Sequence, residues 1–407
     1  MFISVIIPCF IHFFGSSAIN PINLGLFYTM KLLAKTFAGL EEGLADEIKL
    51  LGGQNIKIIK RGVQYEGDKR LLYRSNLELR TALRILMPIA QFRARHESAF
   101  YNKIKDIDWL KYMDVKQTFS IDPVVRSTYF THSQYIGLKA KDAIADLFRE
   151  KMNKRPNVNT ATPDVAINIH INEDEVTVSL DASGDSLHRR GYRVDTLEAP
   201  MNEVLAAGMV LLSGWKGDCD FVDAMCGSGT ILTEAALVAQ NTPPQYAHPS
   251  SPNNREYFCF KRWKDFDQEL FDDILKNTQL HKVEVKHRIM GSDINFQAKR
   301  VSERNVEAAF LTDKIELSRK DFFTLIPPSD KGILMMNPPY DDRLKLEDAQ
   351  DFYKKIGDAM KKNWKGWEVW IISGNLEAVK AIGLKPSKRI TLYNGAIECK
   401  FLKFEMY

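Results

Sequence analysis

The chain has 407 residues, of which 45% are hydrophobic, 27% charged and 11% aromatic. This length predicts two or three domains with hydrophobic cores of their own. The composition excludes a disordered, a collagen-like and a disulfide-scaffold protein.

The five cysteines show no C-x-x-C spacing and lie near no paired histidines. Structural zinc sites need such clusters, and secreted scaffolds need more cysteines. The sequence therefore predicts no metal site and a reducing compartment, the cytoplasm, and it leaves the oligomeric state open. After residue 29 no window approaches 18 uncharged apolar residues, so we expect no membrane association.

Charge is distributed unevenly, although the net charge of the whole chain is only +4. Residues 30–165 carry 24 Lys and Arg against 16 Asp and Glu, whereas residues 195–407 carry 29 against 31. A basic module beside a nearly neutral one is typical of a nucleic-acid-binding region attached to another domain.

Residues 1–29 contain no charged side chain and resemble a signal peptide or a membrane span in composition. They lack the positive charges that begin a signal peptide, and Pro8, Gly15 and Pro21 interrupt any long helix. We expect a non-native or disordered extension here, with a genuine but dispensable tail as the alternative.

The basic region that follows alternates short strand and helix patterns, as in an α+β module. Apolar residues at helical spacing predict helices over Leu40–Leu51, Leu79–Leu86 and Lys139–Lys151. Val165–Ile171 and Glu175–Leu180 alternate apolar and polar residues and predict a hairpin.

A dense basic and aromatic cluster, His188-Arg189-Arg190-Gly191-Tyr192-Arg193, follows this module. Guanidinium groups bind phosphates and an aromatic ring stacks on a splayed base, so the cluster suits RNA. In that interpretation His188, Arg189, Arg190, Tyr192 and Arg193 contact RNA. A linker that needs only solubility has the same composition, and the cluster alone does not separate the two.

From about residue 195, strands and helices alternate in the order typical of a parallel sheet covered by helices. The predicted strands are Asp220–Ala224, Arg288–Gly291, Ile315–Leu317, Gly332–Met336 and Trp367–Ile372. Asn394-Gly395 then joins two strand-like segments, which is the strongest short signal for a hairpin. In the long segment between the first two strands, Phe266, Leu270 and Ile274 predict an amphipathic helix.

The first motif, Asp223-Ala224-Met225-Cys226-Gly227-Ser228-Gly229-Thr230, joins a predicted strand to a predicted helix. Gly227 and Gly229 allow a tight turn and the close approach of a ligand to free N–H groups at a helix N-terminus. The run is neither a Walker loop nor a complete dinucleotide-binding motif. By itself it is more typical of a tight connection than of a site.

Asp293 and Asp321 each follow a predicted strand, at the edge where parallel sheets bind their ligands. A carboxylate there can accept hydrogen bonds from ribose hydroxyls or from an exocyclic amine. Asp is also a common helix N-cap, which is the simpler interpretation for either residue alone.

Asn337-Pro338-Pro339-Tyr340 directly follows the apolar strand that ends at Met336. Two prolines stiffen the turn and fix the direction of the Pro338 carbonyl. The Asn337 oxygen and that carbonyl are two acceptors for an amine, and Tyr340 adds a flat face for its ring. A structural loop after a strand can have the same sequence.

In combination these motifs resemble the class I S-adenosylmethionine-dependent methyltransferases that modify exocyclic amines. With Leu187–Arg193 and Ala199-Pro200, the sequence resembles the THUMP-domain RNA methyltransferases, and among them the bacterial 23S rRNA guanine-N2 methyltransferases. The resemblance implies an α/β fold: a Rossmann-like methyltransferase sheet with a C-terminal antiparallel hairpin, preceded by an α+β ferredoxin-like and THUMP module. The implied boundaries are 1–29 extension, 30–90 ferredoxin-like, 91–181 THUMP, 182–198 basic linker and 199–407 methyltransferase.

The resemblance also implies the roles of the motif residues. Asp223, Cys226, Gly227 and Gly229 line the methionine end of S-adenosylmethionine, Asp293 holds its ribose and Asp321 lies by its adenine. Asn337, Pro338 and Tyr340 present the target base. The family usually continues with Gly-Glu-Arg, whereas this chain has Asp341-Asp342-Arg343, which leaves the role of Arg343 open.

The expected function is therefore methyl transfer to the exocyclic N2 of a guanine in 23S rRNA or a large-subunit precursor. One alternative is an N6-adenine methyltransferase acting on DNA or RNA, because Asn-Pro-Pro-Tyr serves several amines. The other is a non-catalytic RNA-binding or assembly factor that keeps the fold.

Overall fold

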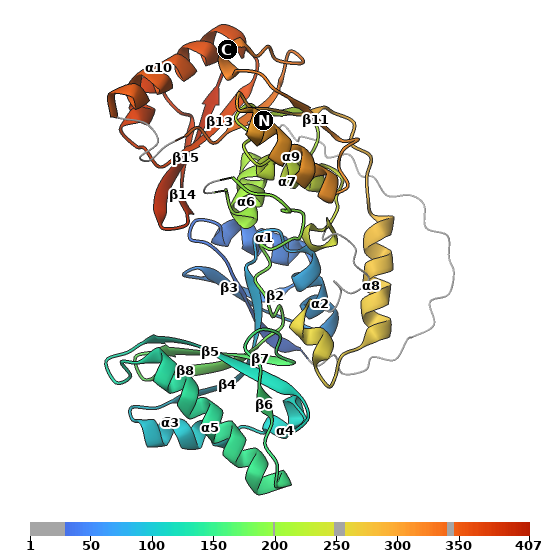
Figure 1. Cartoon of the computed structure of the whole chain (residues 1–407), viewed down its shortest axis with the longest axis vertical. Coiled ribbons are helices and arrows are strands. Elements are labelled where there is room, and N and C mark those ends of the chain that lie inside the picture. The colour runs from blue at the N-terminus through green and yellow to red at the C-terminus, as the bar shows by residue number, and fades with distance from the viewer. Residues whose placement is uncertain (1–28, 198–199, 248–256, 340–345) are drawn as a thin grey trace, which may run out of the picture.

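The computed structural model describes residues 29–197, 200–247, 257–339 and 346–407. Two sheets organise these residues, one of eight strands in the N-terminal half and one of seven in the C-terminal half (Figure 1). Residues 1–28, nearly all of the expected extension, lie outside the described part. Within the described ranges, no helix is long and apolar enough to cross a membrane.

The first sheet has the strand order β2-β3-β1-β4-β8-β7-β5-β6. Its strands are β1 (Met30–Lys35), β2 (Gln54–Ile59), β3 (Gly62–Gly67), β4 (Arg84–Arg93), β5 (Thr118–Arg126), β6 (Asn157–Val158), β7 (Val165–Asn172) and β8 (Glu175–Asp181). Strand β4 pairs antiparallel with both β1 and β8, so the regions expected to be ferredoxin-like and THUMP share one continuous sheet. The predicted hairpin is confirmed as β7 and β8.

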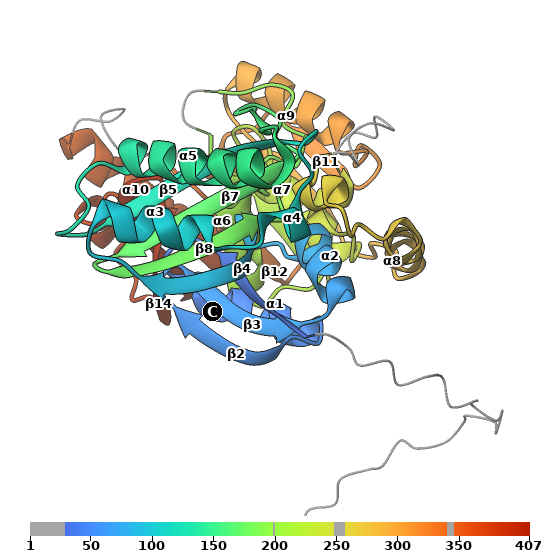
Figure 2. The same cartoon turned by 90° about the horizontal axis from the view of Figure 1, so that it is seen from below.

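Helices cover this sheet: α1 (Glu41–Leu50), α2 (Lys69–Glu78), α3 (Glu97–Lys105), α4 (Trp109–Tyr112) and α5 (Ser133–Met152). Figure 2 shows α3 and α5 side by side over the part formed by β5, β7 and β8. Helix α5 ends at Asn153, whose φ of +54° is the left-handed conformation that stops a helix. The predictions of helices near Leu40–Leu51 and Lys139–Lys151 are confirmed.

The predicted helix over Leu79–Leu86 is wrong. The helix lies earlier, at α2, where the Asp68 side chain caps it by accepting a hydrogen bond from the Leu71 N–H at 2.8 Å. At Leu79 the backbone becomes extended, and the chain enters β4. Only Arg84–Leu86 of this stretch belong to β4, and the residues before them form the connection from α2. Pairing of β4 with its two neighbours overrides the local helical spacing.

The second sheet has the order β11-β10-β9-β12-β13-β15-β14, with parallel neighbours up to β13 and an antiparallel hairpin at its end. Its strands are β9 (Asp220–Asp223), β10 (Ile289–Ser292), β11 (Ile315–Ser318), β12 (Gly332–Met336), β13 (Glu368–Ser373), β14 (Lys388–Asn394) and β15 (Ile397–Glu405). Its helices are α6 (Glu203–Ser213), α7 (Thr230–Ala239), α9 (Phe296–Ala308) and α10 (Leu346–Asn363), with short 3-10 turns η1 (Pro244–Ala247), η4 (Phe322–Thr324) and η5 (Ala378–Ile382). The predicted parallel sheet with a terminal hairpin is confirmed.

The segment that carries the predicted amphipathic helix leaves the second sheet and packs on the first module. It comprises η3 (Cys259–Arg262) and α8 (Gln268–Leu280). Phe260 stacks on Tyr73 of α2 with ring centroids 4.5 Å apart, and Phe258, Phe271 and Ile274 join the same buried core. In Figure 1, α8 accordingly lies beside α2 rather than over the second sheet. The two halves therefore share a core.

Candidate active site

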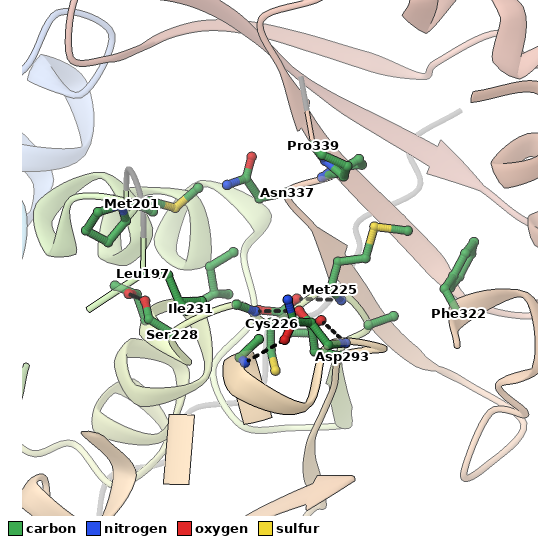
Figure 3. Close-up of a pocket in the computed structure, with 18 of the residues that line it drawn as sticks. Leu197, Met201, Met225, Cys226, Ser228, Ile231, Asp293, Phe322, Asn337 and Pro339 are labelled. Carbon is green, nitrogen blue, oxygen red and sulfur yellow. Dashed lines mark hydrogen bonds between the residues drawn. The ribbon is translucent and has the colours of Figure 1, made fainter. Parts of the chain in front are cut away.

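A cavity of about 880 Å³ opens at the carboxyl ends of the central parallel strands of the second sheet. The strand register brings the motif residues together, because Asp223 lies opposite Gly291 on one side and Met335 on the other. Figure 3 shows Asn337 and Pro339 on one side of the cavity, with Cys226 and Asp293 on the opposite side. The volume is in the range of cavities that hold a cofactor.

The glycine turn between β9 and α7 forms the floor of this cavity. Gly227 and Gly229 have φ of +54° and +78°, a left-handed conformation that other residues adopt at a cost. The Gly227 N–H donates to Asp293 Oδ2 at 3.0 Å, and Gly229 begins α7. The turn is thus held by the carboxylate that directly follows the neighbouring strand β10. Gly227 lines the cavity, and Gly229 supports the turn from behind, against Ser302.

Asp223 is buried at the end of β9. Its Oδ1 accepts a hydrogen bond from the Met225 N–H at 3.3 Å, but within the described residues Oδ2 has no partner. Burial, and then the charge of Asp293, raise the pKa of Asp223 to about 8. A buried oxygen of this kind is stabilised by a hydrogen-bond donor, and a cationic donor would favour the ionised form of Asp223.

Asp293 and Asp321 are partly exposed and both line the cavity. The second oxygen of Asp293 accepts from the Asn295 N–H at 2.9 Å, and Asp321 Oδ1 accepts from the Phe323 N–H at 3.0 Å as the N-cap of η4. The capping interpretation therefore holds for Asp321 only, because α9 is capped by Asn295. Neither carboxylate uses all its acceptor positions in these hydrogen bonds.

Cys226 contributes a buried thiol to the wall of the cavity, 3.7 Å from Ser302 Oγ. Burial raises the pKa of this thiol, so it stays neutral and packs rather than acting as a nucleophile. No group of three or more His, Cys, Asp or Glu side chains suited to a metal ion occurs in the described part of the chain.

Asn337 follows β12 on the other side of the cavity, next to Pro338 and Pro339. Its Oδ1 is buried and has no hydrogen-bond partner among the described residues. An unpaired buried carbonyl oxygen costs free energy unless a ligand supplies a donor. Tyr340 and Asp341-Asp342-Arg343 lie outside the described residues.

The structure contradicts the RNA-binding interpretation for two residues of the basic cluster. Arg190 and Tyr192 are buried, and both bind Glu234 of α7: Arg190 through an ion pair and Tyr192 through its hydroxyl at 2.7 Å. Their charge and ring are used inside the protein, to fix the linker to α7. They are therefore unavailable to RNA.

Arg193 is also mostly buried, and it joins the linker to the cavity wall. It pairs with Glu203 of α6 at 2.7 Å and donates to the Met201 carbonyl at 2.7 Å and to Thr230 Oγ1 at 3.2 Å. Arg189, by contrast, has 65% of its side chain exposed and pairs only with Asp185 among the described residues. His188 is half-buried, and burial lowers its pKa. An RNA contact through Arg189 or His188 stays a prediction.

Several cavity residues were not predicted from the sequence: Leu197, Met201, Met225, Ser228, Ile294, Phe322, Phe352, Asn394, Gly395 and Ile397. Most are apolar residues beside the motifs and carry no signal of their own. Asn394-Gly395 was identified only as a hairpin turn, since nothing in the sequence indicates that this turn reaches the cavity.

Comparison with known families assigns all three regions. Residues 190–403 match the RMKL-like methyltransferase domain (UPF0020), residues 94–181 the THUMP domain and residues 31–86 the RlmL ferredoxin-like domain. The chain belongs to the RMKL-like methyltransferase family. This membership confirms the predicted fold, with its ferredoxin-like and THUMP modules, and the prediction of an S-adenosylmethionine-dependent methyltransferase.

Relatives within this family cover the chain almost entirely. The protein slr0064 of Synechocystis sp., provisionally named an RNA methyltransferase, is 36% identical over 93% of this chain and 97% of its own length. The ribosomal RNA large subunit methyltransferase K/L of Syntrophotalea carbinolica is 34% identical over 93% of this chain, which spans only 54% of that enzyme. The crystal structure of SMU.472 complexed with SAH superposes with a TM-score of 0.84 at 26% identity, covering 93% of this chain and 98% of that one.

Proposed function

We propose that this methyltransferase transfers a methyl group to the exocyclic N2 of a guanine in 23S rRNA or its large-subunit precursor. The observation that carries the proposal is the buried Oδ1 of Asn337, which has no partner in the described part of the chain and lies next to Pro338 at the end of β12. These two residues offer acceptors to both N–H groups of one exocyclic amine.

The other side of the cavity suits S-adenosylmethionine. Asp223, Asp293 and Asp321 all line this side. In this proposal Asp223 Oδ2 accepts from the cationic amino group of the methionine moiety, Asp293 from ribose hydroxyls and Asp321 from the adenine amine. When bound, the cofactor supplies a methyl group on a positively charged sulfur. The glycine turn presents backbone rather than side chains there, which leaves room for close approach.

The chemistry asked of the protein is mainly positioning. The lone pair of an exocyclic amine is delocalised into the ring, which makes it a weak nucleophile. Hydrogen bonds to Asn337 Oδ1 and to the Pro338 carbonyl favour a tetrahedral nitrogen whose lone pair points across the cavity. The nitrogen gains the methyl group as the methyl–sulfur bond breaks and its electron pair stays on sulfur. The nitrogen then loses a proton to water, because the Asn337 and Pro338 amide oxygens are too weakly basic to keep it.

Three observations support RNA as the substrate. Residues 94–181 match a THUMP domain, residues 30–165 carry an excess of eight positive charges, and the relatives are named for RNA and for large-subunit ribosomal RNA. A base within a duplex cannot reach the cavity, so the target guanine is flipped or lies in a loop. Tyr340 would stack on it, contributing about 1–3 kcal/mol by analogy with single-strand binding platforms.

The decisive variant is Asn337→Ala. We expect S-adenosylmethionine binding by calorimetry to be unchanged and methyl transfer to unmodified 23S rRNA to fall about 10²- to 10³-fold, as for the loss of a transition-state hydrogen-bonding group. Asn277→Ala on the exposed side of α8 is the matched control and should keep full activity. Unchanged turnover of Asn337→Ala would disprove the role of this side chain.

Product analysis separates the alternatives. Nucleosides from methylated 23S rRNA, and from naked DNA in a parallel reaction, are identified by mass spectrometry. N2-methylguanosine from rRNA supports the proposal, whereas N6-methyladenine in either polymer would replace it. Cofactor binding without methylation of any polymer would favour the assembly factor.

A further inference from the structure

The β14–β15 hairpin projects beyond the edge of the sheet where the cavity lies. Strand β15 pairs with β13 as far as Ser373 opposite Lys400, and the hairpin continues to Asn394 opposite Ile397. At about 3.4 Å per residue, the three further residues carry the turn roughly 10 Å past the end of β13. The turn thus reaches over the carboxyl ends of the parallel strands.

The tip of this hairpin forms part of the cavity wall through Asn394, Gly395 and Ile397. The strand order shows on which side of the cavity the tip lies. Strands β15 and β14 come after β12 and β13 in the sheet, whereas β10 and β11, which Asp293 and Asp321 follow, are at the other end. The hairpin tip therefore faces the Asn337 side. Ile397 lines the cavity and is 37% exposed there, so its apolar side chain is accessible to a ligand on that side.

The opposite side of the hairpin rests on the ferredoxin-like module. A Cβ atom at Gly39 would collide with the backbone oxygen of Thr391, so the two backbones are in direct contact. Next to them, Leu40 and Leu392 are both buried in one core cluster, with Phe37 and Ile390 packed against it. In Figure 1, β14 accordingly extends down to the segment that precedes α1.

We propose that Ile397 packs against the target nucleotide as a specificity-determining residue, and that the ferredoxin-like module sets its position through the Gly39–Thr391 contact. The inference rests on the proposed function, because it takes the occupant of the Asn337 side to be an RNA nucleotide. It gives the first module a role beyond holding RNA. The module that receives the substrate also positions a wall of the active site.

Two glycines provide a matched test. Gly39 and Gly52 have φ of +90° and +94°, so alanine causes the same backbone strain at both, but a Cβ at Gly52 meets nothing within 4 Å. We expect Gly39→Ala to raise the KM for 23S rRNA about tenfold over Gly52→Ala. The Kd for S-adenosylmethionine should be the same in the two variants. Equal KM values for RNA would overturn the proposed contact.

Ile397→Ala tests the wall itself and, being partly exposed, does not threaten folding. We expect kcat/KM for RNA to fall about tenfold, with cofactor affinity unchanged, whereas Ile326→Ala, at a more exposed site that does not line the cavity, has no effect. An Ile397→Ala enzyme equal to the Ile326→Ala control would overturn the inference while the proposed function stands. Failure of the wild-type enzyme to methylate RNA would instead overturn the proposed function.

Discussion

Two buried carboxyl groups lie close together in the sequence, Asp223 at the end of β9 and Glu234 in the following helix α7. They differ in the partners that surround them. Glu234 has an ion pair with Arg190 and a hydrogen bond from the Tyr192 hydroxyl. Asp223 has one backbone hydrogen bond, and within the described residues its second oxygen is unpaired. The comparison shows that the Glu234 carboxylate is compensated within the fold, whereas we propose that Asp223 Oδ2 is left for a ligand.

The compensated pair also joins the two halves of the protein. Arg190 donates to the carbonyl of Arg80 in the first module, and Arg80 donates in turn to the carbonyls of Leu237 at 3.2 Å and Thr242 at 2.7 Å. The helix that begins at the glycine turn is therefore tied at its other end to the ferredoxin-like module.

The largest effect is expected for Glu234→Ala. Removing this carboxylate leaves the Arg190 charge buried without compensation, which costs about 3–5 kcal/mol of the free energy of unfolding. Urea unfolding measures this cost, and Glu307→Ala on the exposed face of α9 is the control, with an expected change near zero. A loss below about 1 kcal/mol for Glu234→Ala would contradict the structural role.

Asp223→Asn should act in the opposite way. We expect it to weaken S-adenosylmethionine binding by about 1.5–3 kcal/mol, the contribution of a charge-assisted hydrogen bond. At pH 8 and above it should raise the free energy of unfolding of the free protein, because a buried, uncompensated charge is removed. Calorimetry measures the change in cofactor affinity, and urea unfolding measures the change in the free energy of unfolding. A variant that is less stable than the wild type at this pH would contradict the difference between Asp223 and Glu234.

The pH dependence of the same residue gives a second readout. With a pKa of about 8 in the folded protein and about 3.9 when unfolded, Asp223 favours unfolding progressively from pH 4 to 8 and no further above that. A cationic ligand lowers the pKa of Asp223, so binding at pH 6.5 should release close to one proton. Calorimetry in buffers of different ionisation enthalpy measures this release, which Asp223→Asn should abolish.

The motif side of the site could be predicted because its geometry is local. Asp223 ends a parallel strand, and Asp293, Asp321 and Asn337 come shortly after one. Neighbouring parallel strands have their carboxyl ends at the same edge of the sheet. The fold class could be predicted from the alternation of strand and helix patterns along the chain. The helix predicted over Leu79–Leu86 was wrong because β4 is stabilised by pairing with β1 and β8, which lie far away in the sequence.

The remaining features depend on residues far apart in the sequence. Arg190 is indistinguishable from Arg189 by composition, and only the position of Glu234, 44 residues later, makes one internal and the other external. Similarly, Asn394-Gly395 predicts a turn, but the pairing of β15 with β13 is what places that turn at the cavity.

The contrast within the basic cluster leads to the smallest expected effect. Arg189 is exposed, so Arg189→Ala should weaken RNA binding by about 1 kcal/mol or less and reduce the salt dependence of binding by about one phosphate contact. Lys380→Ala, which removes an equally exposed charge on η5, is the control. Filter binding of 23S rRNA fragments at several salt concentrations measures both. Because Arg190 is already neutralised by Glu234, an equal reduction of the salt slope in a folded Arg190→Met variant would contradict the assignment of Arg190 to the interior.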